Sequence, residues 1–253
     1  MDYSAEGVQQ SEMSERMTKW KEDLLLNTES MVLNEFPQRV DEINALINGE
    51  KFNTRRIAFI CGDKAASQTT LDEEQQQQDD ISDERTVLPT KRMKLEPTDN
   101  QLSSDAAVST NKALMEMTQI LYPIITNLME EANRVKMWIL FLIPKIEDGN
   151  NFGVSIQEDV LAEVEEVENG ATTCLSVIVS YLESRAKMAY KMRKHPYIED
   201  YRQLLIDLDK RQFINLRMSL IEVRNHYGAI HDLIVKNLDK IKKPRSNNVH
   251  HLY

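Results

Sequence analysis

Apolar side chains recur at alternating steps of mainly three and four residues through three long stretches of this sequence. The first stretch, which ends at Pro144, holds Leu114, Met117, Leu121, Ile124, Leu128, Val135, Ile139 and Leu142. The second holds Ile156, Val160, Val164, Val167, Ala171, Leu175, Ile178 and Leu182. The third, which ends at Pro244, holds Tyr201, Leu205, Leu208, Leu216, Leu220, Val223, Tyr227, Ile230 and Ile234. Each stretch predicts an amphipathic helix about 50 Å long, at about 1.5 Å per residue.

A further helical pattern lies near the N-terminus. It runs from Met13 to Pro37 and resumes from Val40 to Ile47. We expect one helix with a kink at Pro37, and a bend at Pro123 in the next helix, because proline removes a helical hydrogen bond. Long amphipathic helices joined mostly by short loops predict an all-α fold, an antiparallel four-helix bundle.

The boundaries of the later helices have their own signals. Ser155, with Glu158 three residues later, is typical of a capping box and predicts the start of the third helix at Ser155. That helix is expected to fray in the basic sequence KMRKHP, and Pro196 permits a new start.

The segment 62–107 interrupts the helical pattern. It contains DEEQQQQDDISDER and PTKRMKLEPTDN and few large apolar residues, so we expect it to be disordered in isolation. The sequence thus predicts an N-terminal helical region at 1–61, an acidic, Gln-rich insert at 62–107, the remaining three helices at 108–243 and a flexible tail at 244–253.

Composition excludes several classes of protein. A net charge of −10 and a pI near 5.1 argue against nucleic-acid binding. Cys61 and Cys174 lie far apart and indicate buried thiols in a reducing compartment. The sequence shows neither a secretory signal nor an apolar run of membrane-spanning length, which predicts a soluble, intracellular protein. Glu222 and His226 are four residues apart and do not form the Glu-x-x-His pair of a di-metal bundle. We expect no cofactor, no metal and no enzymatic activity.

One turn between helices is unusually specified. In IPKIEDGNNFGVSIQED, two of the chain's seven glycines stand with two asparagines and a phenylalanine. Gly149 and Gly153 are expected to supply positive φ angles for a tight protrusion. The alternative is an ordinary turn with Phe152 tucked into the end of the bundle. A calcium loop fits poorly, because the EF-hand spacing of oxygen ligands is missing.

The C-terminal sequence KKPRSNNVHHLY has the composition of a flexible arm. It ends in an apolar residue and an aromatic residue beside a carboxylate, which suits insertion into a pocket on a partner. In an antiparallel bundle this tail and the turn before the third helix lie at the same end. The insert and the RKHP turn are expected at the opposite end.

Several of these stretches together resemble the REG-type proteasome activators, most closely the gamma subtype. The resemblance rests on KMWILFLIPKIEDGNNFGVSIQED, RAK, EDYRQ, IKKPRS and the final LY, and it covers nearly the whole chain. It implies a ring of seven identical four-helix subunits with a central channel. Such a ring docks on the proteasome core particle without ATP and stimulates peptide hydrolysis and ubiquitin-independent degradation.

The resemblance also assigns roles to particular residues. The proteasome-binding tail would be His251, Leu252 and Tyr253, which enter pockets of the outer-ring subunits. The activation loop that opens the gate would be Lys145, Ile146, Glu147, Asp148, Gly149, Asn150, Asn151, Phe152 and Gly153. His250 and His251 could make docking sensitive to pH. The implied partners are the core particle, six further copies of the chain, and peptides or unstructured proteins that pass through the channel; no nucleic acid or membrane is implied.

Two basic features complete the set of candidate residues. Lys91, Arg92 and Lys94 predict a nuclear localisation signal in the insert, so the expected compartment is the nucleus, with the cytoplasm as a second one. Lys187 lies in a basic cluster at the end of the third helix and is a candidate for a channel residue that affects specificity. For the basic run in the insert, plain solvated charge is the alternative. For Lys187 the alternative is the favourable placement of cations at a helix C-terminus.

Two other functions stay open from the residues alone. The chain could be a nuclear helical scaffold that binds partners through its insert and has no gating activity. It could also be a metal-dependent bundle enzyme, which would hold iron or manganese when purified.

Overall fold

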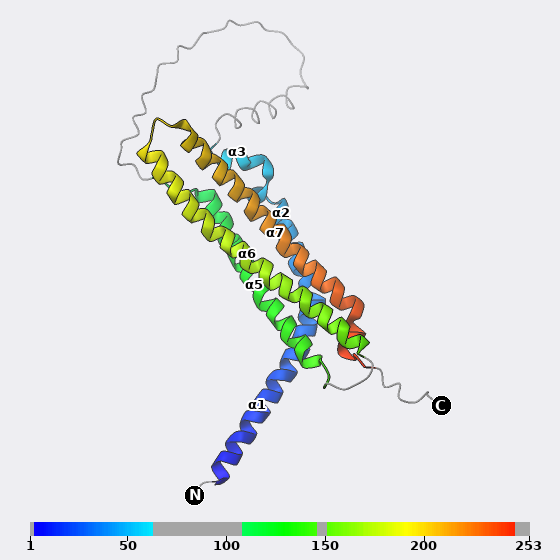
Figure 1. Cartoon of the computed structure of the whole chain (residues 1–253). Coiled ribbons are helices and arrows are strands. Elements are labelled where there is room, and N and C mark those ends of the chain that lie inside the picture. The colour runs from blue at the N-terminus through cyan, green and yellow to red at the C-terminus, as the bar shows by residue number, and fades with distance from the viewer. Residues whose placement is uncertain (1–2, 63–107, 146–150, 246–253) are drawn as a thin grey trace, which may run out of the picture. The chain divides into compact units, whose positions relative to one another are not determined.

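The computed structural model of the chain describes residues 3–62, 108–145 and 151–245. In order, its elements are α1 (Tyr3–Ser30), the π-helical segment η1 (Met31–Glu35), α2 (Phe36–Asn48), the 3-10 turns η2 (Glu50–Phe52) and η3 (Thr54–Arg56), α3 (Ile57–Ile60), α5 (Lys112–Leu142), α6 (Phe152–Lys194) and α7 (Glu199–Lys242) (Figure 1). The described residues include no strand, which confirms the predicted all-α class. None of the described helices is both long enough and apolar enough to span a membrane.

The chain divides into two compact units. Unit 1 comprises Met1–Phe52, Met117–Val179 and Asn215–Tyr253, and unit 2 comprises Asn53–Glu116 and Ser180–Ile214. Helices α5, α6 and α7 each contribute residues to both units.

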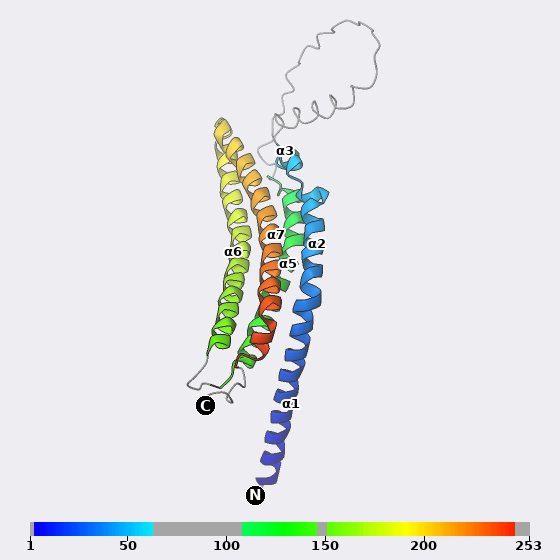
Figure 2. The ribbon, with the colours of Figure 1, turned by 90° about the vertical axis from the view of Figure 1, so that its right-hand side faces the viewer.

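Unit 1 is a helical bundle. Within it, α2 and the adjoining parts of α5, α6 and α7 lie side by side in two perpendicular views (Figures 1 and 2). Their fully or nearly fully buried apolar side chains include Phe36 and Ile43 from α2, Leu121, Ile125, Leu128, Val135, Trp138 and Ile139 from α5, Val160, Val164 and Val167 from α6, and Leu216, Leu220, Val223, Tyr227, Ile230 and Ile234 from α7. Burial of this stripe of each helix is what makes helices of this length stable.

Neighbouring helices in unit 1 are antiparallel, as predicted. Between α5 and α6, Leu142 is linked to Gln157 and Lys136 is linked to Glu168, so one sequence number falls as the other rises. Between α6 and α7, Gln157 is linked to Ile241 and Cys174 is linked to Glu222, so these two helices are antiparallel as well.

The buried face of α6 is shifted from the predicted one at several positions. The buried residues are Gly153, Gln157, Val160, Val164, Val167, Ala171, Cys174, Ile178 and Tyr181. Ile156 and Leu175 are only half-buried, and Leu182 is exposed. The prediction counted large apolar side chains and therefore passed over the small and polar residues that occupy this face. In α5, Ile125 is likewise buried where Ile124 was predicted.

The predicted helix start at Ser155 is wrong. Helix α6 begins at Phe152, and the N–H of Ser155 donates to the carbonyl oxygen of Asn151 at 2.9 Å, an ordinary helical bond. Helix α6 ends at Lys194, which lies within the basic sequence KMRKHP where its end was predicted.

Proline affects the helices differently from what was expected. The irregularity near Pro37 is the π-helical segment η1, which precedes it, and Pro37 itself lies in the first turn of α2. Because proline has no N–H, a wider turn before it accommodates the missing helical bond. Helix α5 runs through Pro123 without interruption, and the expected bend there stays a prediction.

Unit 2 is built around a buried polar cluster. The carboxylate of Asp209 accepts hydrogen bonds from the Tyr181 hydroxyl at 2.9 Å and from Arg185 Nε at 3.0 Å. Asn111 Nδ2 donates both to Asp209 Oδ2 at 3.1 Å and to the carbonyl oxygen of Ile60 at 3.0 Å. This cluster therefore joins the described residues on both sides of segment 63–107.

Candidate functional site at the loop and tail

The structure describes part of the predicted site. Of the activation loop, it describes Lys145 and residues 151–153. Residues 146–150, the tail residues His251, Leu252 and Tyr253, and the basic residues Lys91, Arg92 and Lys94 lie outside the described part of the chain. The site can therefore be built from the two ends of the loop and the base of the tail, all within unit 1.

A buried glutamine of α6 connects the ends of two other helices. Gln157 is fully buried, and its Nε2 donates to the carbonyl oxygens of Leu142 at 3.1 Å and Ile241 at 2.8 Å. Both carbonyls belong to the last turn of their helix, where backbone acceptors lack a helical partner. One side-chain amide thus fixes the end of α5 and the end of α7 to the start of α6.

Gly153 allows the tail base to approach the backbone of α6. A Cβ atom on Gly153 would lie 2.1 Å from the carbonyl oxygen of Pro244 and 2.4 Å from its Cα. The expected positive φ of Gly153 is wrong, because among the described residues only Gly62 has one. The glycine is needed here for space, since any side chain would collide with the backbone of Pro244.

Arg245 holds both ends of the loop. Its Nη1 donates to the carbonyl oxygen of Lys145 at 3.0 Å, and its Nη2 donates to Asn151 Oδ1 at 3.3 Å. Lys145 and Asn151 are the described residues that flank 146–150. A planar guanidinium with several fixed donors can serve two acceptors at once, which a lysine ammonium does less well.

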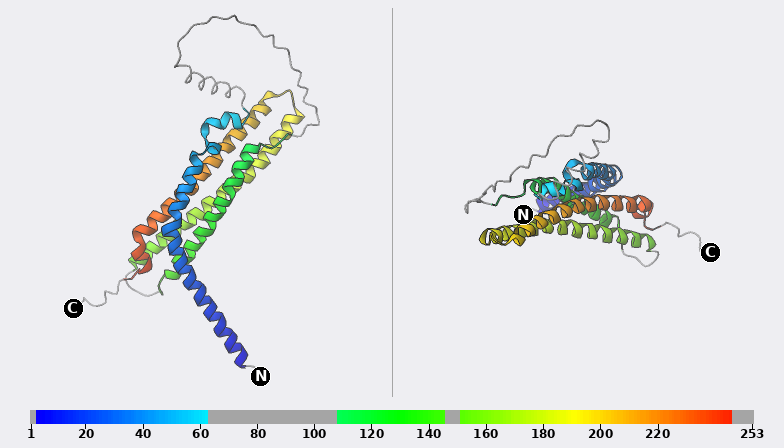
Figure 3. Two further views of the ribbon diagram at one scale, coloured as in Figure 1. Left: turned by 180° about the vertical axis from the view of Figure 1, so that it is seen from behind. Right: turned by 90° about the horizontal axis from the view of Figure 1, so that it is seen from above.

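We call Gly153, Gln157, Pro244 and Arg245, with their contacts at Lys145 and Asn151, the loop–tail joint. In the view from behind, the end of α7 lies beside the end of α5 and the start of α6, in agreement with these contacts (Figure 3). The predicted juxtaposition of loop and tail base is thus present. Sequence reasoning missed Gln157, Pro244 and Arg245; the one available signal was a glutamine at a core position of α6.

Phe152 does not fill the end of the bundle. Its side chain is 67% exposed, so the alternative of a turn closed by a tucked phenylalanine is wrong for this residue. The first residue of α6 therefore presents an aromatic ring at the surface, beside the joint.

The candidate channel residue Lys187 lies in unit 2. Its side chain is exposed and forms an ion pair with Glu183 one turn earlier on α6. The hydrogen bond from Lys187 lowers the pKa of the Glu183 carboxyl. Arg185, from the same basic cluster, instead pairs with the buried Asp209. Of these two basic residues, Lys187 is therefore exposed at the surface, and Arg185 belongs to the buried polar cluster around Asp209.

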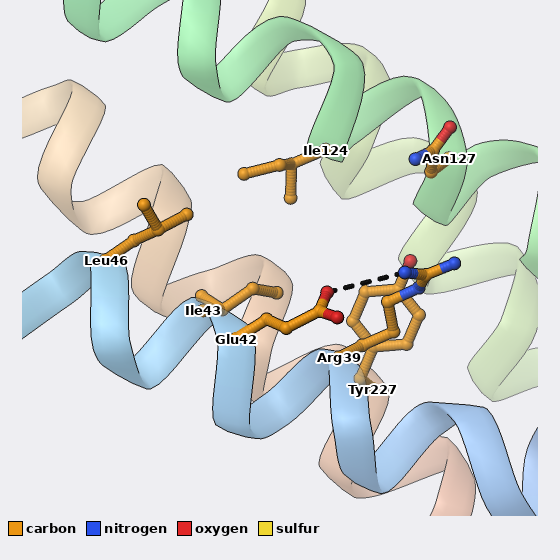
Figure 4. A pocket seen from close by; sticks show the side chains of 7 residues that line it. All are labelled: Arg39, Glu42, Ile43, Leu46, Ile124, Asn127 and Tyr227. Atoms are coloured by element: carbon orange, nitrogen blue, oxygen red, sulfur yellow. Dashed lines mark hydrogen bonds and ion pairs between the residues drawn. The ribbon is translucent and has the colours of Figure 1, made fainter.

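A pocket elsewhere in unit 1 is lined by Arg39, Glu42, Ile43, Leu46, Ile124, Asn127 and Tyr227 (Figure 4). Arg39 pairs with Glu42 at 3.4 Å and with Glu131 at 3.3 Å. The Tyr227 hydroxyl donates to Glu131 at 2.6 Å, and burial together with this bond raises the pKa of Tyr227. The carboxylate of Glu131 is thereby held between a cation and a hydroxyl group, which is a structural arrangement.

The described residues combine a helical fold with a contact between loop and tail. They form an antiparallel helical bundle in which a loop and a C-terminal tail share one joint, and they contain no cluster of His, Cys, Asp or Glu that could hold a metal. The chain belongs to the proteasome activator PA28 family: it matches "Proteasome activator PA28, N-terminal" over residues 11–63 and "Proteasome activator PA28, C-terminal" over residues 107–251.

Individual relatives agree with this membership. The chain is 34% identical over 245 residues to proteasome activator complex subunit 3 of Gallus gallus, covering 96% of each chain. It is similar to the crystal structure of the 11S subunit of the Plasmodium falciparum proteasome, PA28, with a TM-score of 0.69 and 26% identity over 93% of this chain and 95% of that one. The mutated activator bound to an archaeal 20S proteasome shares the fold, with a TM-score of 0.58 and 14% identity over 92% and 94% of the two chains. The family is regulatory, and the chain is not an enzyme.

Proposed function

We propose that this chain is an ATP-independent activator of the proteasome core particle. In this proposal His251, Leu252 and Tyr253 dock in pockets of the outer ring, and the activation loop 145–153 opens the gate. The observation that carries it is the loop–tail joint, where Arg245 contacts both Lys145 and Asn151. If one segment docks and another opens the gate, a contact between their bases places the second segment correctly once the first has docked.

The proposed active form is a ring of seven copies with a central channel for peptides and unstructured proteins. Unit 1 exposes apolar side chains on α1 that a single copy leaves in water, namely Met13, Met17, Trp20 and Leu26. Contact with another copy would cover such a surface. Seven tails on one ring would also turn a weak individual contact into useful avidity.

The insert 62–107 is proposed to direct the protein to the nucleus. The support is compositional, since Lys91, Arg92 and Lys94 form a short basic run in a segment of few large apolar residues. Replacement of all three by alanine is expected to move a fluorescent fusion of the full chain into the cytoplasm. An unchanged nuclear distribution would refute the role.

The gating proposal is tested with purified latent core particle, fluorogenic peptides and no ATP. Three proteins are compared: the full chain, Asn150→Tyr, and a chain that ends at His250. We expect stimulation by the full chain only. The truncated chain should fail to bind the core particle, whereas Asn150→Tyr should bind and not stimulate. Asn150→Ala, which adds no bulk, distinguishes an obstructed loop from a lost contact.

Ring assembly of every variant is checked by analytical ultracentrifugation before activity is compared. An assembled full chain that gives no stimulation would contradict the proposal. A helical scaffold without gating activity would then take its place, and removal of the last three residues should leave partner binding intact.

A further inference from the structure

The loop–tail joint leaves little freedom between its parts. Gly153 and Pro244 meet backbone to backbone, and Gln157 is fully buried between two helix ends. These contacts place the last residues of α7 at a fixed position relative to the first turn of α6. The base of the tail therefore has the rigidity of the bundle.

Arg245 extends this rigid region to the loop. It is the last described residue of the tail, and eight residues follow it. A chain of eight residues spans at most roughly 29 Å, so docking of the C-terminus keeps Arg245 within that distance of the docking pocket. Because Arg245 also contacts Lys145 and Asn151, docking of the C-terminus keeps both ends of the loop near the docking pocket as well.

We propose that Arg245 is a positioning residue that couples docking of the tail to the action of the loop. This inference rests on the proposed function. Arg245 contacts both Lys145 and Asn151 and so restrains the two ends of the loop relative to each other before the ring binds the core particle. A loop with free ends would lose conformational entropy when it presses on the gate, and part of the docked rings would leave the gate closed.

The coupling separates two quantities that a merely structural residue would change together. Affinity for the core particle depends on the tail, whereas the maximal stimulation at saturation depends on the loop. Loss of Arg245 should leave affinity within about twofold and lower maximal stimulation about three- to tenfold, as expected for loss of the net contribution of one ordinary hydrogen bond.

The experiment uses the full chain with Arg245→Ala, Arg245→Lys, Asn151→Ala and the double variant Asn151→Ala with Arg245→Ala. Lys243→Ala is the matched control, because it removes an exposed cation two residues earlier. Binding to immobilised core particle gives affinity, and peptide hydrolysis at saturating activator gives maximal stimulation. Ring assembly and thermal unfolding are measured for each variant.

We expect Arg245→Lys to lie nearer to Arg245→Ala than to the native chain, since an ammonium cannot match the geometry of the guanidinium. The double variant should stimulate as much as Arg245→Ala alone, because Asn151 and Arg245 act through one contact. Lys243→Ala should match the native chain in both quantities.

Gly153→Ala provides an independent test through a different contact. Its methyl group would push Pro244 away, so maximal stimulation should again fall while the tail still docks. If Arg245→Ala does not assemble into rings, the maximal stimulation by Gly153→Ala tests whether the loop–tail joint is needed for gate opening.

Three outcomes would overturn the inference. Native maximal stimulation by Arg245→Ala would show that the loop needs no such hold. Weakened affinity with native maximal stimulation would make Arg245 a docking residue. A fall in stimulation that only follows loss of rings or of thermal stability would make its role structural. A native chain that binds and never stimulates would instead refute the proposed function itself.

Discussion

The carboxylate of Asp209 and the guanidinium of Arg185 form a buried ion pair in unit 2, with Nε 3.0 Å from Oδ1. Only 6% of the Asp209 side chain and 11% of the Arg185 side chain are exposed. The Tyr181 hydroxyl and Asn111 complete the partners of the carboxylate, and Arg185 also donates to the carbonyl oxygen of Ser109. Each charge is therefore both paired and hydrogen-bonded, as a buried pair requires.

Asp209→Ala should destabilise the protein strongly. It would leave the Arg185 charge buried without its partner, and breaking such a pair costs about 3–5 kcal/mol. Urea unfolding followed by circular dichroism measures the loss. Asp207→Ala is the control, because Asp207 is exposed and pairs only at the surface, and it should change stability by less than about 0.5 kcal/mol. Equal effects of the two substitutions would contradict this account of the cluster.

Tyr227→Phe should cost about 1.5–3 kcal/mol near neutral pH, because it removes a buried hydrogen bond to the Glu131 carboxylate. The measurement is again urea unfolding, at pH 8. Tyr122→Phe is the control, since that side chain is 54% exposed.

The contribution of the Tyr227 hydroxyl to the free energy of unfolding should decrease at high pH. The pKa of Tyr227 is raised in the folded protein, so its contribution is fully present below the unfolded pKa of about 10 and is lost as pH rises toward the folded value. The stability difference between the native chain and Tyr227→Phe should therefore shrink above pH 10, by at most about 1.4 kcal/mol per pH unit. A constant difference from pH 8 to pH 11 would argue against the raised pKa.

Lys187→Glu should alter which peptides the stimulated core particle cleaves. If Lys187 faces the channel, reversal of its charge favours basic over acidic peptides, and added salt weakens the effect. The measured quantity is the ratio of hydrolysis rates for basic and acidic fluorogenic peptides. Glu183→Gln removes the partner of Lys187 but keeps the lysine, and serves as control. An unchanged ratio would end the channel role for Lys187.

Cys174 should react slowly with iodoacetamide in the folded protein. Its side chain is buried, and burial raises the pKa of its thiol, so little thiolate is present at pH 8. We expect labelling at least about tenfold slower than in denaturant, measured by mass spectrometry of the peptides. Fast labelling of Cys174 under native conditions would show that this part of α6 opens readily.

The sequence was sufficient for most of the fold, because its signal is long and repetitive. The pattern from Leu216 to Ile234 predicted six buried positions of α7, and all six are buried. The three earlier predicted positions, Tyr201, Leu205 and Leu208, are only half-buried. The same method failed where polar or small residues take core positions. Gln157 and Cys174 are buried, yet neither is a large apolar residue, so the predicted face of α6 shifted to Ile156 and Leu175.

The site was predictable in its placement and not in its contacts. Antiparallel topology alone brings the loop and the tail to one place, and the contact of Arg245 with Asn151 agrees. The roles of Gly153 and Arg245 depend on a backbone approach between residues about ninety positions apart. Patterns of neighbouring residues indicate turns at glycine and surface charge at arginine. They cannot predict that two segments distant in sequence come into backbone contact.

The hydrogen bond from Asn111 to the carbonyl oxygen of Ile60 has a consequence for how proteins of this design can change. This bond ties together the two described ends of the chain between which segment 63–107 runs. Each doubling of the length of a flexible connecting segment raises the loop-closure cost by only about 0.6 kcal/mol. We therefore expect that a change in the length of segment 63–107 alters the stability of unit 2 only slightly. Localisation or binding motifs in this segment could then change during evolution while the helices on either side keep their structure.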